Sequence, residues 1–309
     1  MSSNLLRSPR LRKGDLVRLV SPASYPTQDL IDQNIETVRS WGLRCDTGKH
    51  ILDQHGYMAG TDANRLNDIN AAFRDPEVRA IIATRGGAGA YRISNDIDFA
   101  AVRNDPKPLI GFSDITSMHL SLYDNCQLGV IHGCLFGNTA KASAKKLLMT
   151  TDAITLKPDP SAVSASIQIP GRAQGRLIGG NLQMVATSIG VSLPCMDGAI
   201  LFLEFHRKGL GTIDRYLTQL LRSDRLNGIT GVALGSFEAC RDYTDRGWTV
   251  TDVLTDRLRK LNVPVLGGLS AGHDLSDGNG GFDQSSLPLG SVANLDADRG
   301  FITIESVMC

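Results

Sequence analysis

Short apolar runs alternate with segments of helical periodicity through the first 130 residues of the chain. The runs are rich in Val, Ile and Leu and end at Ser, Pro or Gly, which is typical of buried strands followed by turns. Between them, apolar residues recur every three or four positions, which predicts amphipathic helices. Strands that alternate with helices indicate a parallel sheet with right-handed crossovers. The predicted strands cover 15–20, 78–84 and 109–112, and the predicted helices cover 27–41, 62–74 and 114–124.

The pattern changes over residues 137–172, where a Lys-, Ala- and Ser-rich stretch precedes a polar segment punctuated by prolines. We expect this segment to connect two lobes and to contain one amphipathic helix. The chain is therefore predicted to have an N-terminal lobe over 1–136, a linker over 137–172 and a C-terminal lobe over 173–309. In the C-terminal lobe we expect strands at 176–178, 199–203, 232–234, 264–266, 287–295 and 300–306, and helices at 181–190, 213–220 and 250–261.

Composition narrows the possible function classes without indicating a reaction. Of the 309 residues, 42% are hydrophobic and 21% are charged, and 32 Lys and Arg residues balance 32 Asp and Glu residues. This neutral chain lacks the basic charge that favours nucleic acid or anionic membranes. It also contains no apolar run of about 18 residues that could span a bilayer, and its basic N-terminus lacks the apolar core of a secretory signal.

The six cysteines are irregularly spaced and contain no CxxC pair. We therefore expect reduced thiols in a cytoplasmic protein, with no zinc site and no disulfide framework.

The segment Gly111-Phe-Ser113-Asp114 lies at a predicted junction between a strand and a helix. A serine on such a turn is exposed, and the N–H group of the next residue, at the start of a helix, can stabilise an oxyanion. Ser113 is therefore a candidate nucleophile. The alternative is that Ser113 or Asp114 only caps the helix.

A second glycine-rich turn, Arg85-Gly-Gly-Ala-Gly89, follows another predicted strand. It could hold a phosphate, supply a second oxyanion donor or simply reverse the chain. A dinucleotide site is disfavoured, because the turn lacks the G-x-G-x-x-G spacing and no Walker lysine is present.

A general base could come from one of six histidines, and a carboxylate partner from Glu204. His273 lies in a polar, glycine-rich segment over 267–286, and so long a loop is more often functional than idle. Glu204 closes the apolar run 199–203, so it either points into a cleft at the end of the strand or faces water at an edge. The other histidines are His50, His55, His119, His132 and His206.

Taken in order, these motifs resemble the LD-carboxypeptidase family of serine peptidases, which includes muramoyl-tetrapeptide carboxypeptidases and microcin C self-immunity peptidases. Pro108-Leu-Ile-Gly-Phe-Ser-Asp114 is the most specific match. The similarity also includes Gly14-Asp-Leu-Val, Ser21-Pro-Ala23, Tyr57-Met-Ala-Gly60, Arg65-Leu, Arg85-Gly-Gly87, His132-Gly133, Gly179-Gly-Asn-Leu182, Leu201-Phe-Leu-Glu204, Ile213-Asp-Arg215 and Gly272-His273.

The resemblance implies an α/β fold: an N-terminal parallel-sheet lobe with the serine at a strand–helix turn, and a C-terminal lobe built around a β-barrel-like sheet. It also implies a Ser113–Glu204–His273 catalytic set, with oxyanion donors at Asp114 and at Gly87 or Gly86. No metal and no cofactor are expected. The implied protein is a homodimer that acts on small peptides.

The chain departs from the family pattern at positions that would touch substrate. Ala88 stands where an aromatic or larger residue is usual, Cys134 follows His132-Gly133 in place of proline, and Lys208 replaces a second glutamate. The loop after His273 is also several residues longer than usual. Lys208 is either a substrate-selecting residue or a solvated loop residue.

Three functions are compatible with these observations. The first is hydrolysis of an L–D amide that releases a C-terminal D-amino acid from a murein tetrapeptide. The second is hydrolysis of a peptidyl-nucleotide amide of the microcin C type. The third is ligand binding without turnover, which the joint presence of serine, glutamate and histidine disfavours.

Overall fold

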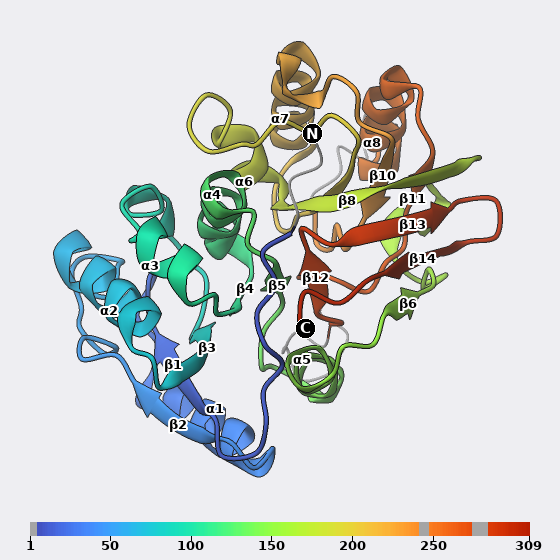
Figure 1. The fold of residues 1–309 in the computed structure, drawn as a ribbon. Helices are drawn as coiled ribbons and strands as arrows, with labels where there is room; N and C mark the ends of the chain where they lie inside the picture. The colour runs from blue at the N-terminus through green and yellow to red at the C-terminus, as the bar shows by residue number, and fades with distance from the viewer. Residues whose placement is uncertain (1–4, 241–246, 274–283) are drawn as a thin grey trace.

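The computed structural model describes residues 5–240, 247–273 and 284–309. Within these ranges the chain forms two α/β lobes, each built on its own sheet, and the lobes pack side by side (Figure 1). The expected two-lobed α/β fold, with a parallel sheet in its N-terminal part, is therefore confirmed.

The N-terminal sheet has six strands within the described residues, in the order β12-β5-β4-β3-β1-β2. Strands β1 to β5 pair in parallel, while β12 joins β5 in the antiparallel sense. The strands are β1 (Leu16–Val20), β2 (Arg44–Thr47), β3 (Val78–Ala83), β4 (Leu109–Gly111), β5 (Val130–His132) and β12 (Leu287–Leu289).

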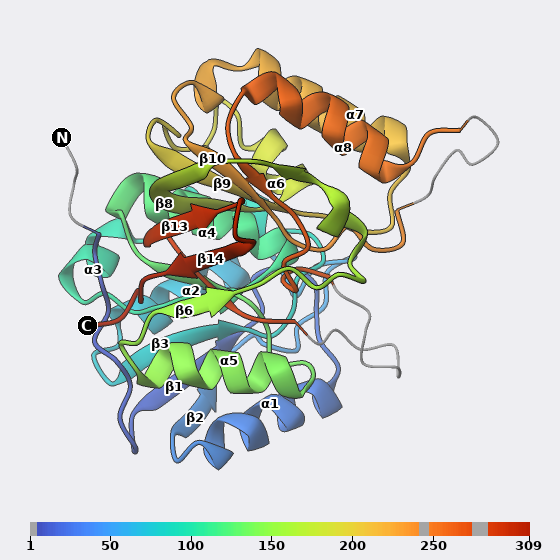
Figure 2. The ribbon, with the colours of Figure 1, turned by 90° about the vertical axis from the view of Figure 1, so that its right-hand side faces the viewer.

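Both faces of this sheet are covered by helices, and successive side chains along a strand pack against opposite faces. On β1, Val17 and Leu19 pack with α1 and α5, and Leu16 and Val20 pack on the opposite face with α2 and α4. Figure 2 shows α1 and α5 together at the bottom of the molecule. The helices are α1 (Gln28–Ser40), α2 (Asp62–Arg74), α3 (Phe99–Asn104), α4 (Thr116–Cys126) and α5 (Asn138–Met149).

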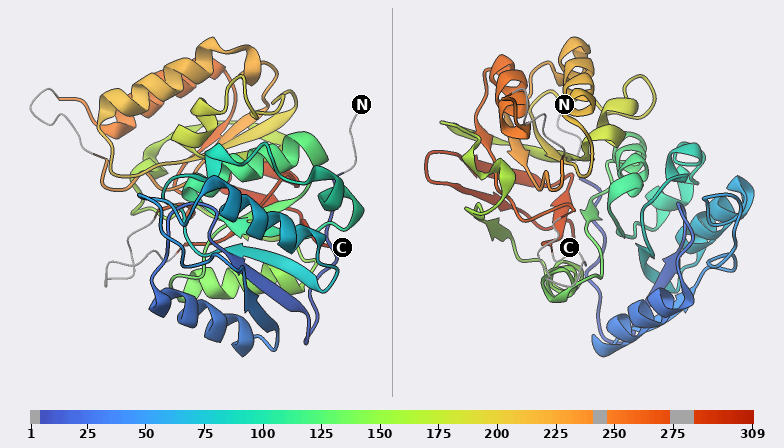
Figure 3. Two further views of the ribbon diagram at one scale, coloured as in Figure 1. Left: turned by 90° about the vertical axis from the view of Figure 1, so that its left-hand side faces the viewer. Right: turned by 180° about the vertical axis from the view of Figure 1, so that it is seen from behind.

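The C-terminal sheet has eight strands within the described residues, in the order β6-β14-β13-β8-β9-β10-β11-β7. Helices α6 (Leu182–Thr187), α7 (Leu210–Arg222) and α8 (Val250–Leu258) cover one face, at the top of both panels of Figure 3. The strands are β6 (Ile154–Leu156), β7 (Gln168–Ile169), β8 (Arg172–Asn181), β9 (Ala199–Glu204), β10 (Gly231–Leu234), β11 (Val265–Leu266), β13 (Val292–Asp296) and β14 (Phe301–Ile304).

Two expectations about the C-terminal lobe need correction. Its sheet is open and not barrel-like, because β6 and β7 lie at opposite edges of the described strands and do not pair. The single strand expected over 287–295 is two strands in different sheets. The strand is interrupted at Gly290, whose φ of +87° is a conformation that favours glycine. As a result β12 pairs in the N-terminal sheet and β13 pairs in the C-terminal sheet.

The segment 137–172 contains more structure than a simple connection. It includes the expected amphipathic helix, which is α5, and it contributes β6 and β7 to the edges of the C-terminal sheet. The lobe boundaries at 136 and 172 stay a prediction.

Candidate active site

Ser113 lies at the carboxyl end of β4, in a short 3-10 turn, η2 (Ser113–Ile115), that leads into α4. Its φ of 61° is a left-handed conformation, which L-residues with a side chain rarely adopt and which costs of the order of 1–3 kcal/mol. A Cβ atom at Gly86 would lie 2.7 Å from the Ser113 Cβ atom. The strained serine turn therefore packs directly against the glycine turn that follows β3.

The glycine turn is held by the loop that follows β1. The Ala88 N–H donates to Ser24 Oγ at 3.1 Å, and the Ser24 N–H donates to the Gly86 carbonyl at 3.3 Å. Gly87 has a φ of +113°, and a side chain there would collide with Ser24. Glycine is thus required at 86 and 87 for this backbone to lie beside Ser113.

Glu204, at the end of β9, and His273, in the loop after β11, form a buried pair. Glu204 is the last residue of β9 and is fully buried, and His273 follows β11 and is 3% exposed. His273 Nδ1 lies 2.6 Å from Glu204 Oε2. The second carboxylate oxygen, Oε1, accepts a hydrogen bond from Asn181 Nδ2 at 3.1 Å.

These contacts set the charge state of Glu204. Burial raises the pKa of its carboxyl group, but the charge and hydrogen bond of His273, helped by His132 and Asn181, outweigh burial and lower the pKa overall. The carboxylate is therefore ionised, and its Oε2 atom lies against Nδ1 of the His273 imidazole.

Gly272 allows the His273 loop to approach Glu204. Its φ is +115°, and a Cβ atom there would lie 2.6 Å from the Glu204 Cβ atom. The Gly272 N–H also donates to the side chain of Gln284. Any larger residue before His273 would push the imidazole away from the carboxylate.

Aromatic rings hold the imidazole of His273 in place. The His206 ring stacks on it with a centroid distance of 3.6 Å and an interplanar angle of 15°, and Phe112 lies 4.8 Å away. Burial and the neighbouring His273 lower the pKa of His206 to about 4. His206 is therefore neutral near pH 7 and adds no positive charge beside His273.

Two cavities meet at Ser113. One, of about 540 Å³, is lined by Ser113 and His273, and we call it the His273 cavity. The other, of about 570 Å³, is lined by Ser113, Tyr91 and Lys208, and we call it the Tyr91 cavity. Gly87 lines both. The structure therefore brings the candidate serine, histidine and glycine together, with Glu204 behind His273.

The Asp114 side chain points into the protein, although its backbone adjoins Ser113. Asp114 Oδ2 accepts a hydrogen bond from the Ala90 N–H at 2.7 Å. Burial raises the pKa of this carboxyl group to about 6, against the opposing effects of the Ala90 N–H and Arg65. Asp114 thus ties the Ser113 turn to the residues after the glycine turn.

Other histidines considered from the sequence lie elsewhere. His50 Nδ1 pairs with Asp68 Oδ1 at 2.9 Å, His55 is exposed, and His119 is buried on α4. Residues 274–283 of the long loop lie outside the described residues. Asn181 was not singled out from the sequence, although the Gly179-Gly-Asn motif contained it.

Two regions of the chain match profiles of one family. Residues 17–133 match the LD-carboxypeptidase N-terminal domain, and residues 174–295 match the LD-carboxypeptidase C-terminal domain. The chain belongs to the LD-carboxypeptidase family.

Full-length relatives agree with this assignment. The "Probable murein peptide carboxypeptidase" of Bacillus subtilis is 33% identical, with 96% of this chain and 93% of the relative covered. The "Murein tetrapeptide carboxypeptidase" of Pseudomonas aeruginosa is 28% identical, with 92% and 94% covered.

Solved structures share the fold of this LD-carboxypeptidase family member. The wild-type microcin C7 self-immunity protein MccF has a TM-score of 0.85 at 23% identity, covering 98% of this chain and 100% of that one. The muramoyltetrapeptide carboxypeptidase of Oxalobacter formigenes has a TM-score of 0.81 at 24% identity, covering 95% and 100%.

The described residues contain neither a candidate metal site nor a candidate membrane-spanning helix. In ranges 5–240, 247–273 and 284–309, no three His, Cys, Asp or Glu residues are grouped so that they could hold a metal ion. None of the helices in these ranges is long and apolar enough to cross a membrane.

Proposed function

We propose that this protein is a serine carboxypeptidase that hydrolyses an L–D amide and releases a C-terminal D-amino acid from a murein tetrapeptide. One observation carries the proposal: Ser113 and His273 line one cavity, and His273 Nδ1 lies 2.6 Å from the buried Glu204 carboxylate. The names of the Bacillus subtilis and Pseudomonas aeruginosa relatives, which refer to murein peptides, support the substrate class.

In the first step of the proposed reaction, Ser113 Oγ attacks the carbonyl carbon of the scissile amide. His273 Nε2 takes the serine proton as the C–O bond forms, and the Glu204 carboxylate stabilises the imidazolium that results. The negative charge on the former carbonyl oxygen is held by the Asp114 N–H together with that of Gly87 or Gly86.

In the second step the C–N bond breaks and His273 returns its proton to the leaving amine. The acyl group remains on Ser113 as an ester, which a water molecule hydrolyses with His273 again acting as the base. The leaving amino acid lies on the side of His273, since His273 must reach its nitrogen. Arg85 lines the His273 cavity and suits the free carboxylate of that amino acid, and Arg207, which lines both cavities, can assist it.

Hydrolysis of a peptidyl-nucleotide amide is the second candidate function. The observation that favours it is Lys208, which lines the Tyr91 cavity and would attract an anionic group on the acyl portion of the substrate near the scissile bond. The same three catalytic residues would serve both substrates.

The decisive experiment incubates the purified protein with a murein tetrapeptide and, separately, with a peptidyl-adenylate, and identifies products by mass spectrometry. We expect release of the C-terminal D-amino acid from the tetrapeptide. Cleavage of the peptidyl-adenylate alone would replace the first proposal with the second. Labelling of Ser113 by a fluorophosphonate probe distinguishes either enzyme from a binding protein without turnover.

We further infer that the enzyme is a cytoplasmic homodimer that needs no cofactor and binds neither nucleic acid nor membranes. The neutral overall charge supports the lack of nucleic acid and membrane partners. Light scattering coupled to size exclusion measures the dimer, and a monomer over the working concentration range would overturn that part.

A further inference from the structure

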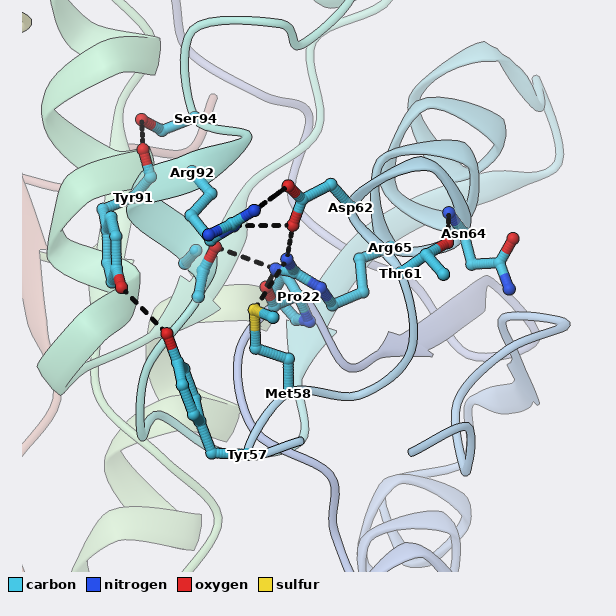
Figure 4. Close-up of polar contacts among 12 residues, drawn as sticks. Pro22, Tyr57, Met58, Thr61, Asp62, Asn64, Arg65, Tyr91, Arg92 and Ser94 are labelled. Atoms are coloured by element: carbon cyan, nitrogen blue, oxygen red, sulfur yellow. Dashed lines mark hydrogen bonds and ion pairs between the residues drawn. The ribbon is translucent and has the colours of Figure 1, made fainter. Parts of the chain in front are cut away.

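Two half-exposed tyrosines meet beside the Tyr91 cavity. Tyr91 is 48% exposed and lines the cavity, and Tyr57 is 54% exposed. Their hydroxyl oxygens lie 3.4 Å apart (Figure 4). Single exposed aromatics are ordinary on protein surfaces, but a touching pair beside a cavity that contains the candidate nucleophile is typical of a ligand subsite.

The backbone of Tyr91 is held in a fixed position relative to the turn that carries Ser113. Tyr91 is the middle residue of η1 (Ala90–Arg92), and the Ala90 N–H donates to Asp114 Oδ2, next to Ser113. The Arg92 guanidinium makes a bidentate pair with Asp62, at 2.9 and 2.7 Å. An aromatic ring mounted in this way needs little ordering when a ligand arrives.

Arg65 connects the segment that carries Tyr57 with the segment that carries Tyr91. Its side chain is buried and donates to the Gly89 carbonyl at 2.8 Å, on the Tyr91 side. It also contacts Met58 Sδ at 3.3 Å, next to Tyr57, and pairs with Asp62. Figure 4 shows the Arg65 guanidinium reaching both Met58, next to Tyr57, and Asp62, which pairs with Arg92. The rings therefore belong to one connected structure and not to two independent surface loops.

The position of His273 indicates which part of the substrate reaches the tyrosines. His273 lines the other cavity, so the leaving amino acid occupies that side of Ser113. The acyl portion of the substrate must then extend into the Tyr91 cavity. In a murein peptide the acyl portion leads back to the muramic acid sugar. In a peptidyl-nucleotide the nucleotide is the leaving group, and its base would lie on the opposite side.

We propose that Tyr57 and Tyr91 form a subsite for the sugar ring of a muramoyl peptide. This inference rests on the proposed function and deepens it. The apolar face of a pyranose ring packs on a phenol ring, while the phenol hydroxyl groups remain available to its polar edge. The enzyme would therefore prefer a glycopeptide over the bare peptide.

The test compares kcat/KM for two substrates that differ only in the sugar: an N-acetylmuramoyl tetrapeptide and the N-acetyl tetrapeptide, whose N-terminus is equally uncharged. We expect wild type to favour the muramoyl substrate about fivefold to tenfold. Tyr91→Ala and Tyr57→Ala should bring this ratio close to one, and Tyr91→Phe should retain most of it because the ring remains.

Trp248→Ala provides the matched control. Trp248 is also half-exposed but lines a separate cavity beside α8, so its removal should leave the wild-type ratio unchanged. A wild-type ratio of one, or a ratio that both tyrosine-to-alanine variants retain, overturns the subsite. Tyrosine variants that impair peptidyl-adenylate cleavage while keeping the muramoyl ratio also overturn it.

The two proposals fail in distinguishable ways. If wild type does not hydrolyse the N-acetyl tetrapeptide or its muramoyl form, the proposed function is wrong. If it hydrolyses both at equal rates, the function stands and only the sugar subsite is wrong.

Discussion

Asn181 and Glu204 are register partners at the carboxyl ends of β8 and β9, and the Asn181 amide donates to the Glu204 carboxylate at 3.1 Å. Asn181 also begins α6, where its side-chain oxygen accepts a hydrogen bond from the Gln183 N–H. The amide is thus fixed at both ends, and it holds the carboxylate that faces His273. We interpret Asn181 as a positioning residue for the proposed catalytic set.

Replacement of Asn181 by alanine should lower kcat about 10-fold to 100-fold, because a buried carboxylate loses a charge-assisted hydrogen bond worth about 1.5–3 kcal/mol. The lost bond also raises the pKa of Glu204, so the acid limb of the pH–kcat/KM profile should move to higher pH. A merely structural defect would lower activity without moving this limb. Asn64→Ala removes a similar bond to the surface residue Asp53 and should change neither quantity.

Alanine at Ser113, Glu204 or His273 should lower kcat by roughly 10³-fold to 10⁶-fold, and the effects should not add, since the three residues act as a unit. Steady-state kinetics of the single and double variants measures this. Ser161→Ala, which changes an exposed serine, serves as the control. A Ser113→Ala enzyme that keeps more than a tenth of wild-type activity would exclude the serine mechanism.

Dialysis against EDTA should leave kcat/KM unchanged, because the proposed steps use only serine, histidine, glutamate and backbone N–H groups. The assay is repeated after addition of zinc. Activity that disappears on chelation and returns with zinc would contradict the mechanism.

The sequence predicts those helices and strands that have a clear hydrophobic pattern within their own residues. The apolar run of β3 and the helical stripe of α2 are found close to their expected positions, and Thr61 caps α2 by accepting a hydrogen bond from the Asn64 N–H. The strand β2 was missed because its four residues are partly exposed and form no apolar run. The helix α3 was missed because it is short and buries only Val102.

Features that depend on pairing between distant segments could not be predicted. Local sequence gives no sign that 287–289 pairs with β5 while 292–296 pairs with β8. The Asn181–Glu204 bond depends on the register of two strands, and the Tyr57–Tyr91 contact on two loops that Arg65 joins. Ser113 and Glu204 were visible because both stand at the end of an apolar strand.

Lys208→Glu should change substrate choice between two peptides that differ by one charge near the scissile bond. Lys208 is exposed on the wall of the Tyr91 cavity, so wild type should favour the anionic peptide. Reversing the charge should shift the ratio of kcat/KM values about threefold to tenfold toward the cationic peptide. Lys145→Glu on α5 is the control for charge alone. A ratio that Lys208→Glu leaves unchanged would show that the lysine is only solvated.

His132 should make the protein less stable in mild acid. It ends β5, is fully buried and lies between Phe112 and Phe202, with ring centroids 6.3 and 5.3 Å away. Burial lowers its pKa to about 4, although Glu204 opposes the shift. Above the unfolded pKa of about 6.5 both states are neutral; as the pH falls from there toward 4, only the unfolded chain gains the proton.

Because of the lowered pKa of His132, the free energy of unfolding should fall by about 2 kcal/mol between about pH 7.5 and about pH 5. His119, whose pKa burial lowers to about 3, acts in the same direction, whereas Asp114, whose pKa is raised to about 6, opposes it. Urea titrations at the two pH values isolate the His132 contribution when wild type is compared with His132→Leu. The pH difference should shrink in this variant and stay at the wild-type value in His55→Leu, which changes an exposed histidine. Equal pH differences in all three proteins would mean that His132 does not stay neutral in the folded state.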